Sequence, residues 1–149
     1  REINRSRRYA RPFSLLMIDI DYFKKINDRW GHPAGDMVLR ELSAMMRANF
    51  RKLDVPVRYG GEEFAVLLPE TSLEDAIQLA ERFRVTVEQA SFVHSRERIP
   101  VTISLGVASI GNSPISEELD SEELLQYADR ALYQAKQNGR NRIAAGRGI

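Results

Sequence analysis

The distribution of apolar residues predicts several buried strands. FSLLMIDID is apolar on both faces until Asp19 interrupts it, which is typical of a strand inside a sheet. VTISLGVASI has the same character, and we expect Gly106 to break it. VPVRY and EFAVLLP are separated by little more than Gly60 and Gly61, which predicts a β-hairpin whose tight turn explains the glycines. NRIAAG predicts a last short strand.

Helical periodicity fills the stretches between these strands. YFKKINDRW predicts a short helix, closed by a loop at residues 31–33, and a longer helix follows. Ser72 and Asp75 form a capping-box-like start to a third helix. Ser121 is expected to cap a fourth, which ends at Gly139 in a position that glycine favours. The second and third helices present apolar faces made of Val38, Leu39, Leu42, Met45 and Met46, and of Leu73, Ala76, Ile77, Ala80, Phe83 and Val87.

The predicted order of elements is β-α-α-β-β-α-β-α-β. Such an order favours a mixed sheet with helices packed on it, of the α+β or α/β class. At 149 residues the chain fits one domain, and it contains no internal repeat or linker. REINRSRRYARP is rich in arginine and predicts a polar helix ending before Pro12. Because the chain begins at Arg1 and not at Met, we expect residues 1–149 to be the C-terminal part of a longer protein with an upstream sensor or regulatory domain.

Composition narrows the function without deciding it. With 22 Lys and Arg against 21 Asp and Glu, the net charge of +1 suggests neither a nucleic-acid binder nor an acidic module. The absence of cysteine excludes disulfides and thiolate metal sites, and it suits a reducing cytoplasm, where we expect the domain to work. No apolar run approaches the roughly 20 residues that span a bilayer, so we expect no membrane contact from this domain.

Three carboxylates are the first candidates for chemistry. Asp19 ends a buried strand, where a charge is costly unless it is paired or bound to a metal. One interpretation makes it the N-cap of the helix that follows. The other brings it together with Glu62 and Glu63, if the hairpin strand lies beside the first strand. Two or three clustered carboxylates favour Mg²⁺ or Mn²⁺, and bound Mg²⁺ commonly also holds substrate phosphates.

Groups able to bind phosphate are also present. The helix that opens after Asp21 offers backbone N–H groups and the positive end of a dipole, and Lys24 lies on its first turn. Lys136 and Arg140 lie around a helix end, where cations also simply complement the dipole. No P-loop motif occurs, and His94 lies in a polar loop where we assign it no role.

Asn27 and Asp36 flank the loop that follows the first helix. An amide can donate to a carbonyl oxygen and a carboxylate can accept from N–H groups, and guanine presents both kinds of group on one edge. The alternative is that Asp36 only caps a helix end.

Four sequence blocks carry a family resemblance. DIDYFKKINDRWGHPAGD, RYGGEEF, VTISLGVA and YADRALYQAKQNGRNR resemble the signature blocks of the GGDEF family, the diguanylate cyclases, in the family's order and from about Phe13 to Ile143. GGEEF is an accepted variant in which Glu62 replaces Asp. The resemblance implies a central, mostly antiparallel sheet surrounded by helices, similar to class III nucleotide cyclases and polymerase palm domains. It also implies the condensation of two GTP into cyclic di-GMP with release of two pyrophosphates.

The resemblance implies a role for each matching residue. Asp19 and Glu62 would bind the metal ions with the help of the Ile20 carbonyl, and Glu63 would bind metal or activate the attacking ribose 3′-hydroxyl. The triphosphate would be bound by the N–H groups near Phe23 and by Lys24, Lys136 and Arg140. Asn27 and Asp36 would bind guanine. Gly60 and Gly61 would let the nucleotide lie close to the backbone.

Regulation is implied in the same way. One domain binds one GTP, so an antiparallel homodimer would be the working species. In RKLD, Arg51 and Asp54 would bind cyclic di-GMP at a product-inhibition site, with Arg82 as a second basic contact. The alternative for RKLD is a surface ion pair. The alternatives for the whole domain are a non-catalytic cyclic di-GMP receptor and a GTP-binding regulatory module.

Overall fold

A five-stranded sheet forms the centre of the molecule. The computed structural model describes residues 11–110 and 121–146. The strands run in the order β2-β3-β1-β6-β7, with bounds Val55–Arg58, Glu63–Pro69, Phe13–Ile20, Ile103–Ile110 and Ile143–Ala145. All neighbours are antiparallel except β6 and β7. The predicted α+β class and mostly antiparallel sheet are therefore confirmed.

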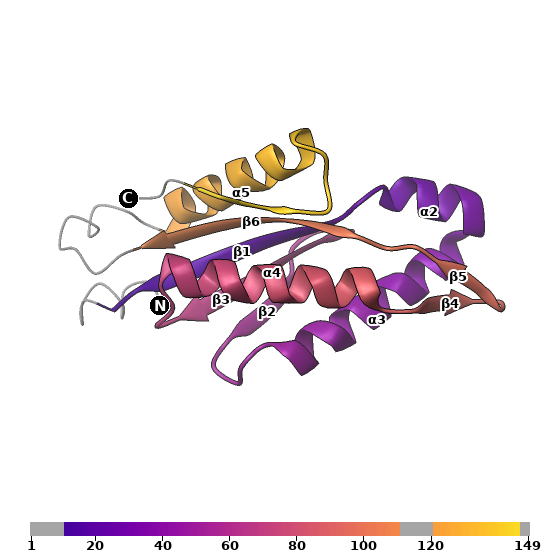
Figure 1. Ribbon diagram of the computed structural model, residues 1–149, viewed down its shortest axis with the longest axis horizontal. Helices are drawn as coiled ribbons and strands as arrows, with labels where there is room; N and C mark the ends of the chain where they lie inside the picture. The colour runs from indigo at the N-terminus through magenta and orange to yellow at the C-terminus, as the bar shows by residue number, and fades with distance from the viewer. Residues whose placement is uncertain (1–10, 111–120, 147–149) are drawn as a thin grey trace.

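Helices cover both faces of this sheet (Figure 1). The four are α2 (Phe23–Trp30), α3 (His32–Asn49), α4 (Leu73–Gln89) and α5 (Ser121–Gln137). Because side chains alternate along a strand, Leu16 and Ile18 of β1 pack in one core with α2, α3 and α4. Leu15 and Met17 pack in a second core with α5. Every residue of β1 and β6 is buried, which explains why both strands read as continuous apolar runs.

A small hairpin escaped the sequence analysis. β4 (Phe92–His94) and β5 (Glu97–Ile99) form a separate two-stranded sheet, so His94 lies in a strand and not in a polar loop. The turn between them uses Ser95 and Arg96, both with positive φ. Asn-Gly or Asp-Gly usually marks such a turn, and that signal is missing here.

Gly106 does not break its strand. β6 runs uninterrupted through it, and a Cβ at this position would lie 2.2 Å from the carbonyl oxygen of Ala128 and 2.3 Å from the amide nitrogen of Leu132. The glycine is therefore needed because the backbone of α5 packs directly on the strand. The predicted loop at residues 31–33 is likewise shorter than expected, since His32 and Pro33 begin α3 and only Gly31 separates the helices.

The helix ends agree with the sequence where they can be compared. Ser72 accepts a hydrogen bond from the Asp75 N–H at 3.2 Å, and Gly139 has a φ of +125° just beyond α5. The predicted N-terminal polar helix and the side chain of Ser121 lie outside the described residues. In the part of the chain that the structure describes, no helix is both long and apolar enough to cross a membrane.

Candidate active site

The end of β1 lies beside the start of β3. Asp19 and Glu63 are directly opposite in the antiparallel register, and the Ile20 N–H donates to the Glu62 carbonyl oxygen at 3.4 Å. The expectation that the hairpin strand is a neighbour of the first strand is therefore confirmed. The backbone positions of Asp19, Glu62 and Glu63 meet at one edge of the sheet.

Asp19 is a buried carboxylate with one satisfied oxygen. It is 3% exposed, and Lys136 of α5 donates from Nζ to its Oδ2 in a close ion pair. Oδ1 is buried and has no hydrogen-bond partner among the described residues. The N-cap interpretation is wrong, because the N-cap of α2 is Tyr22 and no side chain caps it. A buried oxygen without a partner is unfavourable, which points to a missing ligand.

Glu62 shares the environment of Asp19. Burial, followed by the negative charge of Asp19, raises the pKa of Glu62, and Lys136 opposes this only in part. In the described ranges no three Asp, Glu, His or Cys side chains gather as a metal cluster. The carboxylate with the largest charge effect on Glu62 is Asp19. Two carboxylates, one of which has an unpartnered oxygen, fit a hard cation such as Mg²⁺, because the pair contains no sulfur or imidazole ligand.

The turn between β2 and β3 does not itself explain its glycines. Arg58 donates from Nε to the Gly60 carbonyl oxygen at 3.2 Å and from Nη2 to that of Gly61 at 2.6 Å. Neither glycine has a positive φ, and a Cβ on Gly61 would meet no atom within 4 Å. The interpretation that the tight turn requires both glycines is thus not supported at Gly61.

Cationic side chains gather where α2 begins. Arg140 lies over the ring of Tyr22 at 4.8 Å from its centroid, and Lys25 lies 4.6 Å from the same centroid. With no side chain at the cap, the first N–H groups of α2, from Phe23 on, are available to an anion. Lys24 lies on this turn, but its side chain is 89% exposed and points into solvent, where Nζ lies 3.2 Å from Oδ2 of Asp28.

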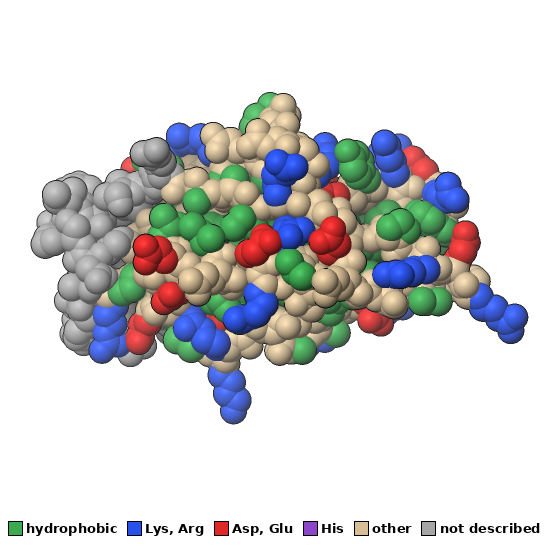
Figure 2. All heavy atoms as spheres, viewed as in Figure 1, with side chains coloured by type: hydrophobic (Ala, Val, Ile, Leu, Met, Phe, Trp, Pro, Cys, Tyr) green, Lys and Arg blue, Asp and Glu red, His purple; other side chains and the backbone are tan. Residues whose placement is uncertain are grey.

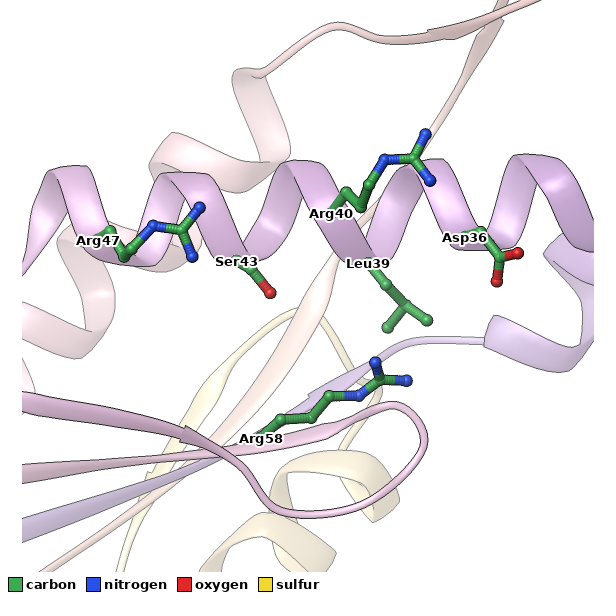
Figure 3. Close-up of a pocket in the computed structure, with 6 residues that line it drawn as sticks. All are labelled: Asp36, Leu39, Arg40, Ser43, Arg47 and Arg58. Carbon is green, nitrogen blue, oxygen red and sulfur yellow. The ribbon is translucent and has the colours of Figure 1, made fainter.

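Asn27 and Asp36 come from the two helices that Gly31 joins. A Cβ on Gly35 would lie 1.9 Å from Oδ1 of Asn27, so glycine is required for the Asn27 side chain to rest against α3, one residue before Asp36. Asp36 lines a pocket of about 480 Å³ between α3 and β2 (Figure 3). In that view Leu39 and Arg58 point toward each other, whereas Arg40 points away. The remaining lining residues are Ser43 and Arg47.

Comparison with known proteins identifies the family of this chain. A family model described as "Diguanylate cyclase, GGDEF domain" matches residues 1–142. The chain belongs to the GGDEF family. It is 49% identical over 137 residues to the response regulator PleD of Caulobacter vibrioides, covering 89% of this chain but 29% of that protein.

Solved GGDEF structures have the same fold. The active GGEEF domain of a diguanylate cyclase from Vibrio cholerae superposes with a TM-score of 0.88 at 35% identity, covering 99% of this chain and 91% of that one. The GGDEF domain of DgcB from Caulobacter crescentus, solved in complex with c-di-GMP, gives 0.89 at 31% identity, covering 97% and 83%.

In the RKLD segment of this GGDEF domain, Arg51 pairs with Asp54 and also donates from Nη2 to Thr71 Oγ1 at 2.5 Å. Arg51 donates to Asp54 from its backbone N–H at 2.9 Å, from Nε at 3.0 Å and from Nη2 at 2.7 Å. The Asp54 side chain is fully buried, and its hydrogen bond raises the pKa of Arg51. The ion-pair geometry named as the alternative is thus present. Arg82 is exposed on α4.

The hydrogen bonds of Asp21 in this GGDEF domain were not predicted from the sequence. Asp21 is 4% exposed and accepts from the hydroxyls of Thr102 at 2.7 Å and Ser104 at 2.6 Å, and from the Asn141 N–H at 2.9 Å. These bonds tie the segment that carries Arg140 to the end of β1. The only available signal was its spacing of two residues from Asp19 in DIDY, which does not reveal partners more than 80 positions away.

Proposed function

We propose that this domain is a diguanylate cyclase, which condenses two GTP into cyclic di-GMP and releases two pyrophosphates. The observation that carries the proposal is the buried Asp19 carboxylate, which has an unpartnered oxygen and lies beside Glu62 of the GGEEF turn. Family membership and the names of the matched proteins support it. The activity of the longer protein is part of the same proposal, because the chain covers only 29% of PleD.

Asp19 and Glu62, with the Ile20 carbonyl, would hold Mg²⁺ or Mn²⁺. When bound, such an ion neutralises charge on phosphate oxygens and polarises the phosphorus toward attack. Asp19 Oδ1 has no hydrogen-bond partner among the described residues and would bind the ion, while Lys136, which pairs with Oδ2, would also bind a phosphate oxygen. The raised pKa of Glu62 favours its protonated form, and a metal-binding carboxylate is deprotonated, so a proton and a cation would compete for Glu62.

Glu63 is the proposed general base, and it would take the proton of the ribose 3′-hydroxyl as that oxygen attacks the α-phosphorus of the second GTP. Glu63 lies opposite Asp19 in the antiparallel register of β1 and β3, and this position supports the proposed role. A role as a further metal ligand is open to the same carboxylate.

The substrate-binding roles follow from charge and position. Lys136, Arg140, Lys24 and the N–H groups at Phe23 would bind the triphosphate, since they surround the uncapped start of α2 or contact Asp19. Asn27 and Asp36 would bind guanine from the α2–α3 junction. Gly60 and Gly61 would let the nucleotide lie against the turn, because at Gly61 the protein itself leaves the space of a side chain empty.

The product joins two nucleotides, whereas one domain offers one such site. Two copies must therefore face each other as a homodimer, and an upstream domain that changes their pairing would control the rate. Cyclic di-GMP would inhibit by binding Arg51, Asp54 and Arg82. For this the Arg51 guanidinium has to turn from Asp54 to the ligand.

The test is direct incubation of the domain with GTP and Mg²⁺, followed by identification of nucleotides by mass spectrometry. We expect cyclic di-GMP from the wild type and none from Glu63→Gln. Binding of cyclic di-GMP without any turnover would favour the receptor, and binding of GTP without turnover would favour the regulatory module. Either result at high protein concentration or with enforced dimers contradicts the proposal.

A further inference from the structure

We infer that Arg84 of α4 is a positioning residue for the triphosphate-binding Arg140, and that it acts through Asn141. The inference deepens the proposed function and rests on it. Arg84 lies in none of the signature blocks, and it is 57 positions from Asn141 in the chain.

Arg84 is an enclosed cation held by several acceptors. Its side chain is only 14% exposed. Nη2 donates to Glu81 at 2.7 Å, and Nη1 lies 3.3 Å from Glu88 and 2.8 Å from Oδ1 of Asn141. Figure 2 shows acidic and basic side chains interleaved along α4 on the face in view. Burying a guanidinium is costly unless its donors are satisfied, so this arrangement is specific and not a loose surface pair.

Asn141 is fixed from three directions. Its Oδ1 accepts from Arg84, its Nδ2 donates to Glu88 at 2.8 Å, and its backbone N–H donates to Asp21 at 2.9 Å. Both polar atoms of the Asn141 side-chain amide are thus bound by residues one turn apart on α4, and its backbone N–H is bound to Asp21 just after β1.

The backbone of this segment needs such support. Arg140 has a φ of +62° and Asn141 a φ of +47°. Two successive left-handed residues other than glycine are unfavourable and persist only where surrounding contacts hold them. The contacts of Asn141 supply part of this support, beside the bonds of the Arg140 N–H to the Ala135 carbonyl and of Arg142 Nε to the Arg140 carbonyl, both at 3.0 Å. The direction in which Arg140 leaves the backbone, over the Tyr22 ring at the start of α2, therefore depends on them.

Glu81 provides a matched control. Glu81 accepts from Nε and Nη2 of Arg84, whereas Asn141 accepts from Nη1. Glu81→Gln keeps an acceptor oxygen for Arg84, so it tests whether any disturbance of this salt bridge has the same effect. If Arg84 acts as inferred, only changes that release Asn141 affect the phosphate site.

Two variants release Asn141 in different ways. Asn141→Gly tolerates the left-handed backbone and removes both side-chain contacts. It keeps the N–H bond to Asp21 and the long contact, 3.5 Å, of Arg84 Nη1 with the residue-141 carbonyl oxygen. Arg84→Met keeps the length of the side chain and removes its donors. The probes are α,β-methylene GTP, which cannot release pyrophosphate, and GMP, which lacks the β- and γ-phosphates. Affinities are measured by calorimetry with Mg²⁺ present.

We expect both variants to bind the GTP analogue about tenfold more weakly than the wild type and to bind GMP with unchanged affinity. Glu81→Gln should bind both nucleotides with wild-type affinity. Combined with Arg140→Ala, Asn141→Gly should cause no further loss. Equal weakening of both nucleotides would indicate a merely structural role, and unchanged affinities or additive losses would also overturn the inference. A wild type that binds neither nucleotide would instead overturn the proposed function, and the role of Arg140 with it.

Discussion

Lys136 of α5 pairs with Asp19 of β1, 117 positions earlier in the chain. The pair joins the cation expected to bind phosphate to the carboxylate expected to bind metal. It leaves one buried Asp19 oxygen without a partner among the described residues. The protein alone therefore satisfies half of the Asp19 carboxylate, and the proposed metal ion would satisfy the other half.

Asp19→Asn should separate metal binding from stability. The amide keeps the shape of Asp19 and can still accept from Lys136, but it loses the charge that attracts a divalent cation. We expect Mn²⁺ affinity to fall by at least about tenfold and turnover by about 100-fold or more. The melting temperature should change by only a few degrees, and calorimetry with thermal unfolding measures both. A variant with full activity would remove Asp19 from the metal site.

Glu62 should make stability depend on pH in the absence of metal. Its raised pKa means that the native state keeps a proton where the unfolded chain, with a value near 4.5, has released it. This contribution to stability is fully present below about 4.5 and is lost as the pH rises through the native pKa.

Urea unfolding in EDTA, from about pH 4 to 7, measures this effect. Relative to Glu62→Gln, the wild type should lose free energy of unfolding across that window. Mn²⁺ affinity should rise over the same window, because the ion competes with the proton. Parallel stability curves for the two proteins would show that Glu62 is not perturbed.

Gly61 and Gly106 should respond to alanine in opposite ways. A Cβ at Gly106 would lie 2.2 Å from the Ala128 carbonyl oxygen, so we expect Gly106→Ala to lower the free energy of unfolding by about 3 kcal/mol. Gly61 has open space, so Gly61→Ala should fold like the wild type and still lose turnover by about tenfold or more if the nucleotide lies against the turn. Full turnover in Gly61→Ala would show that substrate does not approach there.

Arg51→Ala should weaken product inhibition and stability together. The variant leaves the fully buried Asp54 carboxylate with only the residue-51 backbone N–H, which should cost about 2–3 kcal/mol. Arg82→Ala serves as the matched variant, since Arg82 is exposed and its loss should reduce inhibition without destabilising the fold. Initial rates at increasing cyclic di-GMP measure the inhibition constant, which we expect to rise about tenfold. Unchanged inhibition in Arg51→Ala would reduce RKLD to a structural ion pair.

The sequence predicted the sheet well because its central strands are buried on both faces. The β2–β3 hairpin was likewise predictable, since the short link between VPVRY and EFAVLLP left little choice of pairing. Its position beside Asp19 was only a conditional hypothesis, which the β1–β3 register confirms. The β4–β5 hairpin could not be found, because its left-handed turn uses Ser95 and Arg96 in place of glycine or asparagine.

Long-range partners were equally invisible in the sequence. Gly106 looked like a strand breaker because only the packed structure shows α5 lying on it. The ion pair of Lys136 with Asp19 and the contact of Arg84 with Asn141 join charges far apart in the chain. Composition and spacing cannot assign such pairs, since many other pairings of like residues were available.

The ratio of pyrophosphate to cyclic di-GMP, measured at several protein concentrations with GTP and Mg²⁺, tests the central claim most directly. Condensation between two facing domains predicts two pyrophosphates for each cyclic di-GMP. It also predicts a rate per protein molecule that rises with concentration until all domains are paired. GTP that binds without releasing pyrophosphate, or pyrophosphate that appears without cyclic di-GMP, would contradict the assignment of Asp19, Glu62 and Glu63 to this reaction.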